Sequence, residues 1–182
     1  TDIRRTHMAA ALIYASLGTP MIHQGLDFLH SKEGIENTYQ RGDLNALDYS
    51  ALKRQLESHH YFQSWIQFRQ SAWGDCLRLE NSPSETYMKI FRSSHSEHSS
   101  AVILYNADYS KGGKQILLML NPHFESTYIP LGQHSASDWK LIASIDRFNL
   151  EGIETDFVCV DRDTIELPPL SIFLAVRPAW NG

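Results

Sequence analysis

The pattern of apolar residues changes near residue 74 of this 182-residue chain. Before that point, apolar side chains recur at helical spacing around one long polar loop, and after it they form short runs separated by turn residues. Apolar residues three and four apart predict helices, and short apolar runs between turn signals predict strands. We therefore expect two domains, residues 1–74 and residues 75–182.

The first helix is expected over Ile3–Leu17. Asp2 can cap its start, and Gly18 followed by Pro20 can end it. Its middle is apolar on nearly every side, which is typical of a buried helix or of one that has lost its neighbours. Either other elements surround it, or it has lost its neighbours, in which case we expect residues 1–74 to be partly disordered or to borrow a partner surface.

A buried parallel strand is expected directly after this helix. The short apolar run Pro20–Ile22 ends at Gly25, and a run of that length with a glycine stop suits a strand covered on both faces. A helix, a tight turn and a buried strand form the αβ step of an α/β barrel or a doubly wound sheet.

Residues 26–49 form a long polar loop, and loops of that length in a compact domain are usually functional or disordered. A second helix follows from about Ser50 to Ser71, and Gly74 ends it. Trp65 is expected to pack this helix against its neighbours.

The second half predicts an antiparallel β-sandwich, because its short apolar runs are separated by turn signals at regular intervals. The expected strands are Cys76–Glu80, Thr86–Phe91, Ala101–Asn106, Gln115–Asn121, Thr127–Pro130, Trp139–Ile145, Phe157–Asp161, Thr164–Leu167 and Ser171–Val176. About 100 residues can bury a core of their own.

Composition excludes several classes of partner. The formal net charge is -5, and no block of Lys and Arg occurs, so we expect neither a nucleic acid nor an anionic membrane as partner. No apolar run approaches the roughly 20 residues of a membrane-spanning helix. The two cysteines, Cys76 and Cys159, either form one disulfide or stay reduced and inert, and the second is commoner. The chain starts without Met or a signal peptide, which we interpret as the mark of a processed product or a fragment.

A family resemblance enters with the segment around the expected strand. The string Gly18-Thr19-Pro20, an apolar pair and Gly25-Leu26-Asp27 resembles the end of the catalytic barrel in the α-amylase superfamily, where the eighth strand reads Gly-x-Pro and then Gly-x-Glu. The continuation is similar to the pullulanase branch of that superfamily, and it reads Lys32-x-Gly34-x-x-Asn37-Thr38-Tyr39-x-x-x-Asp43-x-Asn45-x-x-Asp48-Tyr49.

The resemblance implies an α+β chain that contains the terminal βα portion of a (β/α)8 barrel followed by the sandwich. It implies a glycoside hydrolase that cleaves α-1,6-glucosidic branch points in pullulan, glycogen or starch. This sequence departs from the family pattern at three positions: Asp27 stands where Glu is usual, Thr38 replaces Ser, and Tyr49 replaces Trp.

Catalysis by this chain alone is not expected. A complete barrel needs about 200–250 residues and draws its catalytic groups from several strand ends. Retaining glycosidases need two carboxyl groups about 5–5.5 Å apart. In the family that this chain resembles, the nucleophile, the acid/base and the third carboxylate all lie upstream. We assign no catalytic residue here, and we expect a loop-bracing or solvated role for Asp27.

Five loop residues are candidate glucan contacts by the resemblance: Asp43, Asn45, Tyr39, Asn37 and Lys32. Short carboxylate and amide side chains bind sugar hydroxyls at close range. The alternative is structural: Asp43 and Asn45 are then turn formers, Tyr39 a packing residue, and Asn37 and Lys32 shape the loop.

The expected partners are an α-glucan, bound through the complete enzyme, and the upstream barrel of the same protein. No cofactor and no metal site are expected for the chemistry, although Asp- and Asn-rich loops leave calcium open. The rival interpretation is a non-catalytic glucan-binding or purely structural β-sandwich module. Trp139 is a core or strand-edge residue in the first case and a stacking platform in the second.

Overall fold

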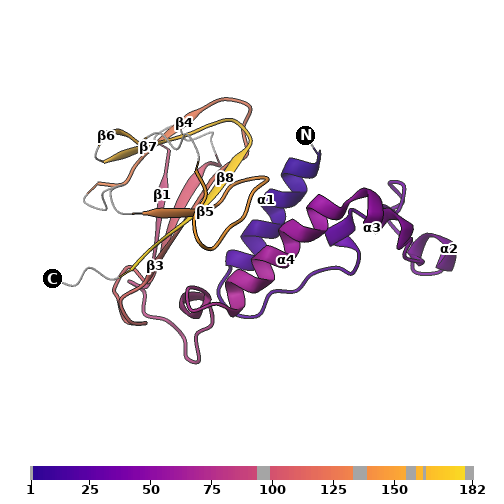
Figure 1. Ribbon diagram of the computed structural model, residues 1–182, viewed down its shortest axis with the longest axis horizontal. Coiled ribbons are helices and arrows are strands. Elements are labelled where there is room, and N and C mark those ends of the chain that lie inside the picture. Colours follow the sequence, from indigo (N-terminus) through magenta and orange to yellow (C-terminus); the bar gives the residue numbers. More distant parts are fainter. Residues whose placement is uncertain (1, 94–98, 133–138, 155–158, 162, 179–182) are drawn as a thin grey trace.

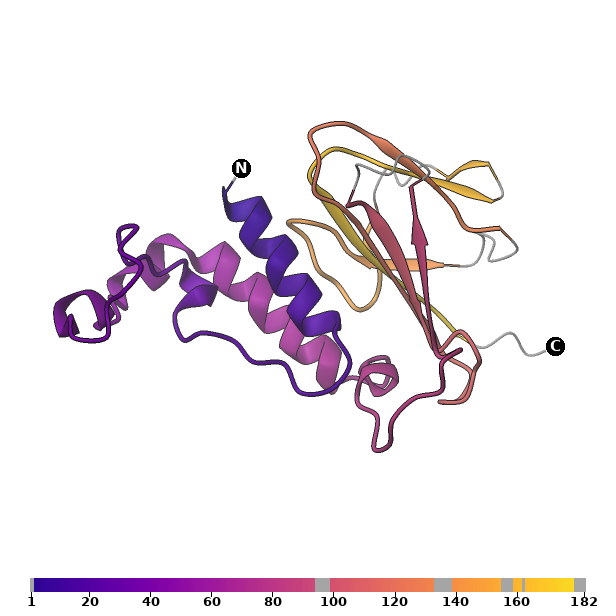
Figure 2. The ribbon, with the colours of Figure 1, turned by 180° about the vertical axis from the view of Figure 1, so that it is seen from behind.

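The computed structural model describes residues 2–93, 99–132, 139–154, 159–161 and 163–178. Helices come first and antiparallel strands follow, so the chain is a mixed α+β structure. In both views of the ribbon the helices lie to one side of the strands, and α2 is the element farthest from them (Figure 1, Figure 2).

The helical elements are α1 (Asp2–Ala15), η1 (Leu26–Phe28), α2 (Gly42–Asn45), α3 (Ser50–Arg54), α4 (Leu56–Gln70) and η2 (Gly74–Leu77), where η marks a 3-10 helix. The expected first helix is confirmed, with Asp2 as its first residue instead of its cap. The expected second helix is interrupted at Gln55, which separates α3 from α4.

Helix α1 buries one side only, as expected of a helix that lacks some of its neighbours. Its side chains Met8, Ala11 and Tyr14 are buried, whereas Ile3 and Leu12 are 48% and 39% exposed. The apolar sequence on the remaining side has no covering element in the described part of the chain.

The strand expected at Pro20–Ile22 does not form, and this is the largest difference from the prediction. Residues 19–23 are coil, and Met21 is 87% exposed. A strand exists only through hydrogen bonds to a neighbouring strand. The described residues supply none here, so the apolar run stays unpaired.

The β half folds into two antiparallel sheets. The strands are β1 (Met88–Arg92), β2 (Ala101–Tyr105), β3 (Gln115–Asn121), β4 (Thr127–Pro130), β5 (Lys140–Ala143), β6 (Cys159–Asp161), β7 (Thr164–Leu167) and β8 (Ser171–Arg177). One sheet has the order β1-β2-β3-β8-β5, and the other has the order β4-β7-β6.

The two sheets pack face to face, which confirms the predicted sandwich. Val102 and Leu104 of the larger sheet, together with Ile129 and Leu167 of the smaller one, belong to one buried cluster. The predicted strand Cys76–Glu80 is wrong, because its start is the 3-10 helix η2 instead. A short apolar run does not by itself distinguish a strand from a helical turn. Residues 157 and 158 of the predicted strand Phe157–Asp161 lie outside the described residues.

The central strands β3 and β8 of the larger sheet are buried on both faces, and this explains their unbroken apolar runs. Along β3, Leu117 and Met119 point into the sandwich core, whereas Ile116, Leu118 and Leu120 belong to a second cluster. That second cluster also contains Tyr61, Phe62, Trp65 and Phe68 of α4 and the buried side of α1.

Helices and strands therefore share one hydrophobic cluster, and Trp65 is fully buried in it, as expected. The division into domains at residues 74 and 75 stays a prediction. Cys76 is a free, buried cysteine, and burial raises the pKa of its thiol to about 11, so it is inert at neutral pH. The side chain of Cys159 lies outside the described residues.

Candidate functional site

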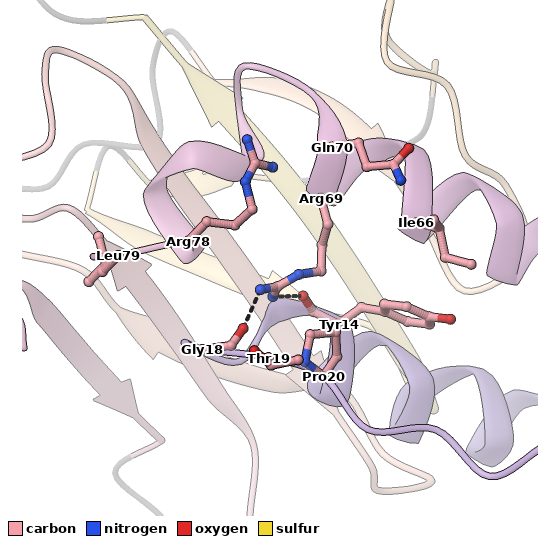
Figure 3. A pocket seen from close by; sticks show the side chains of 9 residues that line it. All are labelled: Tyr14, Gly18, Thr19, Pro20, Ile66, Arg69, Gln70, Arg78 and Leu79. Atoms are coloured by element: carbon pink, nitrogen blue, oxygen red, sulfur yellow. Dashed lines mark hydrogen bonds between the residues drawn. The ribbon is translucent and has the colours of Figure 1, made fainter. Parts of the chain in front are cut away.

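The segment from Gly18 to η1 is held at both of its ends. At the first end, Arg69 of α4 donates hydrogen bonds to the main-chain oxygens of Tyr14 and Ser16, at 2.7 Å and 2.8 Å, and also to that of Gly18 (Figure 3). These oxygens lie in the last turn of α1 and directly after it, where carbonyl groups lack helical partners and attract a cation. Arg69 thus fixes the exit of α1 against α4.

Gly25 fixes the other end. Its φ is 90°, and a Cβ there would lie 2.9 Å from the Cβ of His30 and 3.0 Å from Leu47. Only glycine meets both the left-handed backbone and the close approach. The main chain can therefore turn directly into η1 and present Asp27.

Asp27 and His59 join η1 to α4. The Nδ1 of His59 lies 2.6 Å from Oδ2 of Asp27, and both side chains are about one third exposed (35% and 30%). The carboxylate accepts this hydrogen bond and holds the imidazole ring in one orientation. Asp27 therefore braces the loop against the helix, as the sequence predicted.

A pocket of about 570 Å³ opens beside this pair. Its lining residues are Tyr14, Ile22, His23, Gln24, Gly25, Asp27, Phe28, Tyr49, His59, Phe62, Gln63 and Ile66. Its walls combine apolar and aromatic side chains with a few polar groups, which is the usual composition of a small-molecule site. Asp27 is its only carboxylate among the described residues, so the pocket lacks the pair that a retaining glycosidase needs.

The candidate residue Asn45 is bonded to the loop itself. Its amide donates to the main-chain oxygen of Thr38 at 2.5 Å, and the Thr38 hydroxyl donates to Oδ1 of Asn45 at 2.8 Å. Thr38 is buried, so these two hydrogen bonds hold the ends of the loop segment 38–45 together. The structural alternative for Asn45 has direct support, because its amide is already engaged.

Asp43 forms a bidentate ion pair with Arg41. The guanidinium donates from Nε at 2.9 Å and from a terminal nitrogen at 2.6 Å to the two carboxylate oxygens. These bonds lower the pKa of Asp43 below its ordinary value, so the carboxylate is ionised at neutral pH. Asp43 lies exposed on α2, and a carboxylate with two oxygens can still accept from a sugar hydroxyl.

The other three candidates lie along the same loop. Tyr39 is 78% exposed, and its hydroxyl accepts a hydrogen bond of 2.8 Å from Gln40. Asn37 is exposed and Lys32 is half-buried. None of the five candidates lines the pocket beside Asp27.

Sequence reasoning missed four residues that the structure gathers around the candidate site: Gln24, Arg41, Tyr49 and His59. Tyr49 carried a signal, because it occupies the position where the pullulanase pattern has Trp. His59 carried none, since its partner Asp27 lies 32 positions earlier and only the packing of η1 on α4 brings them together.

Among the described residues, no group of three or more His, Cys, Asp or Glu side chains is arranged to hold a metal ion. Within those residues, too, no helix has the length and apolar character that crossing a membrane requires.

Trp139 lies just before the edge strand β5. The guanidinium of Arg177 sits 4.4 Å from the centre of its ring, and the side chain is half-buried. One face of the ring is therefore occupied by a cation–π contact, which agrees with the strand-edge interpretation.

Comparison with known proteins shows what this chain is similar to. No protein-family model matches the chain. Pullulanase of Bacillus subtilis (strain 168) is 32% identical over 116 residues, which cover 63% of this chain and 16% of that enzyme. This chain resembles part of a pullulanase. The resemblance inferred from the loop motif is thereby confirmed over part of the chain.

Solved structures of longer proteins share the fold. The catalytic module of the multi-modular glycogen-degrading pneumococcal virulence factor SpuA superposes with a TM-score of 0.77 at 14% identity, over 99% of this chain and 32% of that one. The Group B Streptococcus pullulanase SAP in complex with maltotetraose gives 0.74 at 16% identity, over 96% of this chain and 28% of that one. The chain therefore spans less than a third of the length of these two proteins.

Proposed function

We propose that this chain is a C-terminal fragment of a pullulanase-type glycoside hydrolase that cleaves α-1,6-glucosidic branch points in pullulan, glycogen or starch. The observation that carries the proposal is the 32% identity to Bacillus subtilis pullulanase over 116 residues. In this proposal, residues 1–74 are the end of the catalytic barrel, and residues 75–182 are the sandwich that follows it.

The chain contributes glucan contacts from the loop around α2. Asp43 offers an ionised carboxylate that Arg41 holds in place, and Tyr39 offers an exposed ring for stacking on a glucose unit. Asn45 acts through the loop, because its bonds to Thr38 set the position of Asp43 two residues earlier. Asn37 and Lys32 lie on the approach to the same loop and complete the set.

The fragment is inactive alone, because cleavage with retention needs a nucleophile and an acid/base across one scissile bond. The pocket beside Asp27 supplies one carboxylate, and that one already accepts a hydrogen bond from His59. The maltotetraose complex of the Group B Streptococcus enzyme supports a maltooligosaccharide as the ligand of the complete enzyme.

Reducing-sugar release from pullulan tests the proposal, with this chain compared to the same polypeptide extended upstream to a complete barrel. We expect activity from the longer protein only. In that protein, Asp43→Ala should raise KM about tenfold, because a hydrogen bond to a charged group contributes about 1.5–3 kcal/mol. Asn45→Ala should have a smaller effect on KM and lower the stability of the loop.

Glu151→Gln is the matched control, since Glu151 is 92% exposed on the sandwich and should leave both kinetic constants unchanged. Activity of the short chain would contradict the fragment interpretation. Inactivity of both proteins, with maltotriose bound by the short chain, would favour the rival glucan-binding module. Inactivity without binding would favour a purely structural module.

A further inference from the structure

The loop that carries the candidate glucan contacts is closed at its base. It runs from Leu29 to Asp48, between η1 and α3. The 3-10 helix η1 contacts both α3 and α4, so the beginning and the end of the loop lie side by side. Helix α2 lies at the far end of the loop, away from the sheets (Figure 1). Contacts at the base can therefore control where α2 lies.

Two apolar contacts join the beginning of the loop to its end. The rings of Phe28 and Tyr49 lie with their centroids 5.7 Å apart. The side chain of Leu47 packs against Gly25, because its Cδ2 lies 3.0 Å from the position that a Cβ on Gly25 would take. Bringing the ends of a long loop together costs conformational entropy, and these contacts offset that cost.

One polar contact fixes the base of the loop to α4. Nδ1 of His59 donates a hydrogen bond of 2.6 Å to Oδ2 of Asp27 on η1. Helix α4 is itself held in place, since its Phe62 and Trp65 are buried in the core shared with the sandwich. Together with the two apolar contacts, this hydrogen bond forms what we call the loop clamp.

The loop clamp contains two of the three positions at which this chain departs from the pullulanase pattern. Asp27 stands where Glu is usual, and Tyr49 stands where Trp is usual. Asp is one methylene shorter than Glu, and its carboxylate is already at hydrogen-bonding distance from His59. All three side chains line the same pocket of about 570 Å³. They therefore fit one another as a matched set.

Beyond the loop clamp, the far part of the loop is held by its own hydrogen bonds. Thr38 is bonded to Asn45, and Arg41 is paired with Asp43. Among the described residues, no hydrogen bond or ion pair joins residues 38–46 to α4 or to the sandwich. This part can therefore move as one unit, and the contacts at the base set its position relative to α4.

We propose that the loop clamp sets the affinity for glucan by holding Asp43 in its binding position. Asp27, Tyr49 and His59 are then a matched set of positioning residues, and none of them needs to touch the sugar. This inference rests on the proposed function, because it concerns the loop that is proposed to contact glucan. Without the clamp, the binding-competent position of the loop is less populated, and the apparent affinity falls by the same factor.

Hydrogen exchange in this chain tests the loop clamp independently of catalysis. His59→Leu removes the donor to Asp27, so the amides of residues 38–46 should exchange about three- to fivefold faster, as expected for the loss of a partly exposed ion pair. The amides of β3 should be unaffected. Unchanged exchange in residues 38–46, or equal acceleration in β3, would overturn the proposal.

Two further variants act as controls for this exchange experiment. His59→Gln can still donate to Asp27 and should retain most of the protection. His60→Gln should change nothing, because His60 is exposed and lies next to His59 on α4. Faster loop exchange in His60→Gln, equal to that in His59→Leu, would overturn the role of the Asp27–His59 bond.

Steady-state kinetics in the polypeptide extended upstream to a complete barrel tests the link to glucan. His59→Leu should raise KM for pullulan about three- to fivefold and leave kcat nearly unchanged, because the clamp acts on binding. In an Asp43→Ala background the same substitution should have little further effect, since His59 acts through Asp43. Equal fold-changes in both backgrounds would overturn the proposal.

Returning Asp27 to the residue that is usual in the family tests whether the set is matched. Asp27→Glu should raise KM, because the added methylene must displace the His59 ring or fold back from it. A lower KM for Asp27→Glu than for the unchanged protein would show that Asp27 and His59 do not fit one another as proposed.

These measurements separate the loop clamp from the proposed function. If the longer protein hydrolyses pullulan and His59→Leu leaves KM unchanged, the proposed function stands and the role of the clamp in affinity is rejected. If the longer protein does not hydrolyse pullulan, the proposed function is rejected, and the Kd for maltotriose replaces KM as the test of the clamp. A Kd that His59→Leu leaves unchanged would then overturn the clamp as well.

Discussion

At the scale of single residues, His7 links the helices to the sandwich. Its Nδ1–H donates to the main-chain oxygen of Ile145 at 2.8 Å, and its Nε2 accepts from the Ser58 hydroxyl at 3.1 Å. The ring stacks on Tyr61 with centroids 4.2 Å apart, and Tyr61 in turn donates to the oxygen of Ser144. The Ile145 carbonyl can only accept, so Nδ1 carries a proton, and in the neutral imidazole that burial favours, Nε2 is free to accept from Ser58.

We expect His7 to make stability depend on pH. Burial lowers the pKa of His7 below its ordinary value of 6.5, and the nearby Asp146 carboxylate offsets this only in part. As the pH falls below about 6.5, His7 becomes protonated in the unfolded chain before it does in the folded chain. The contribution of His7 to the free energy of unfolding should therefore be at its maximum above that pH. It should fall as the pH drops, by at most about 1.4 kcal/mol per pH unit.

The measurement is urea denaturation between pH 5 and pH 8. His7→Gln keeps a donor and an acceptor but does not titrate, so its stability should depend less steeply on pH. His60→Gln is the matched control, because His60 lies exposed on the neighbouring helix α4. Equal slopes for the wild-type chain and His7→Gln would contradict the assignment.

At the scale of elements, the junction of α4 with η2 requires a glycine. Gly74 is buried, and a Cβ there would lie 2.3 Å from the main-chain oxygen of Arg69 and 2.6 Å from that of Phe68. Main-chain atoms cannot move aside as a flexible side chain can. The close turn is also what brings Cys76 and Leu77 into the shared core, where the sequence alone suggested a strand.

Gly74→Ala should destabilise the chain by about 2–3 kcal/mol, because the added methyl group displaces the last turn of α4. Gly42→Ala is the control, since a Cβ at Gly42 meets nothing within 4 Å. Its effect should stay within about 1 kcal/mol, the usual difference between Gly and Ala in a helix. Urea midpoints of the two variants measure the contrast, and equal midpoints would contradict it.

At the scale of the whole molecule, helices and strands share a core. Trp65 packs edge-on against Phe148, whose chain follows β5, with ring centroids 5.1 Å apart. Leu118 and Leu174 of the larger sheet belong to the same cluster as Phe62 and Phe68 of α4. Separating the two halves would expose this cluster, at a cost of about 25 cal/mol for each Å² of apolar surface.

We therefore expect α1 and β3 to unfold in one transition. Hydrogen exchange measured as a function of urea should give the same midpoint for peptides from both elements, as cooperative units do. Loss of protection in α1 at clearly lower urea would instead support residues 1–74 as an independently unfolding domain, the division predicted from the sequence.

Local patterns predicted the β half closely. The bounds of β3, β4 and β7 agree with the expected strands, because short apolar runs were bounded by clear turn residues. The loop motif from Lys32 to Tyr49 also predicted the relationship to pullulanases. Its five candidate contacts could be named from the sequence, whereas their partners Arg41 and Thr38 became evident only in the structure.

The sequence by itself determined the helical start, the antiparallel sandwich and the family of the loop motif, because each depends on residues close together in the chain. The tertiary structure decided which side of α1 is buried, that Asp27 meets His59, and that Pro20–Ile22 remains unpaired. The physical reason is the same in each case. Burial, ion pairing and strand formation depend on a partner that is distant in the sequence, and local periodicity does not specify whether that partner is present.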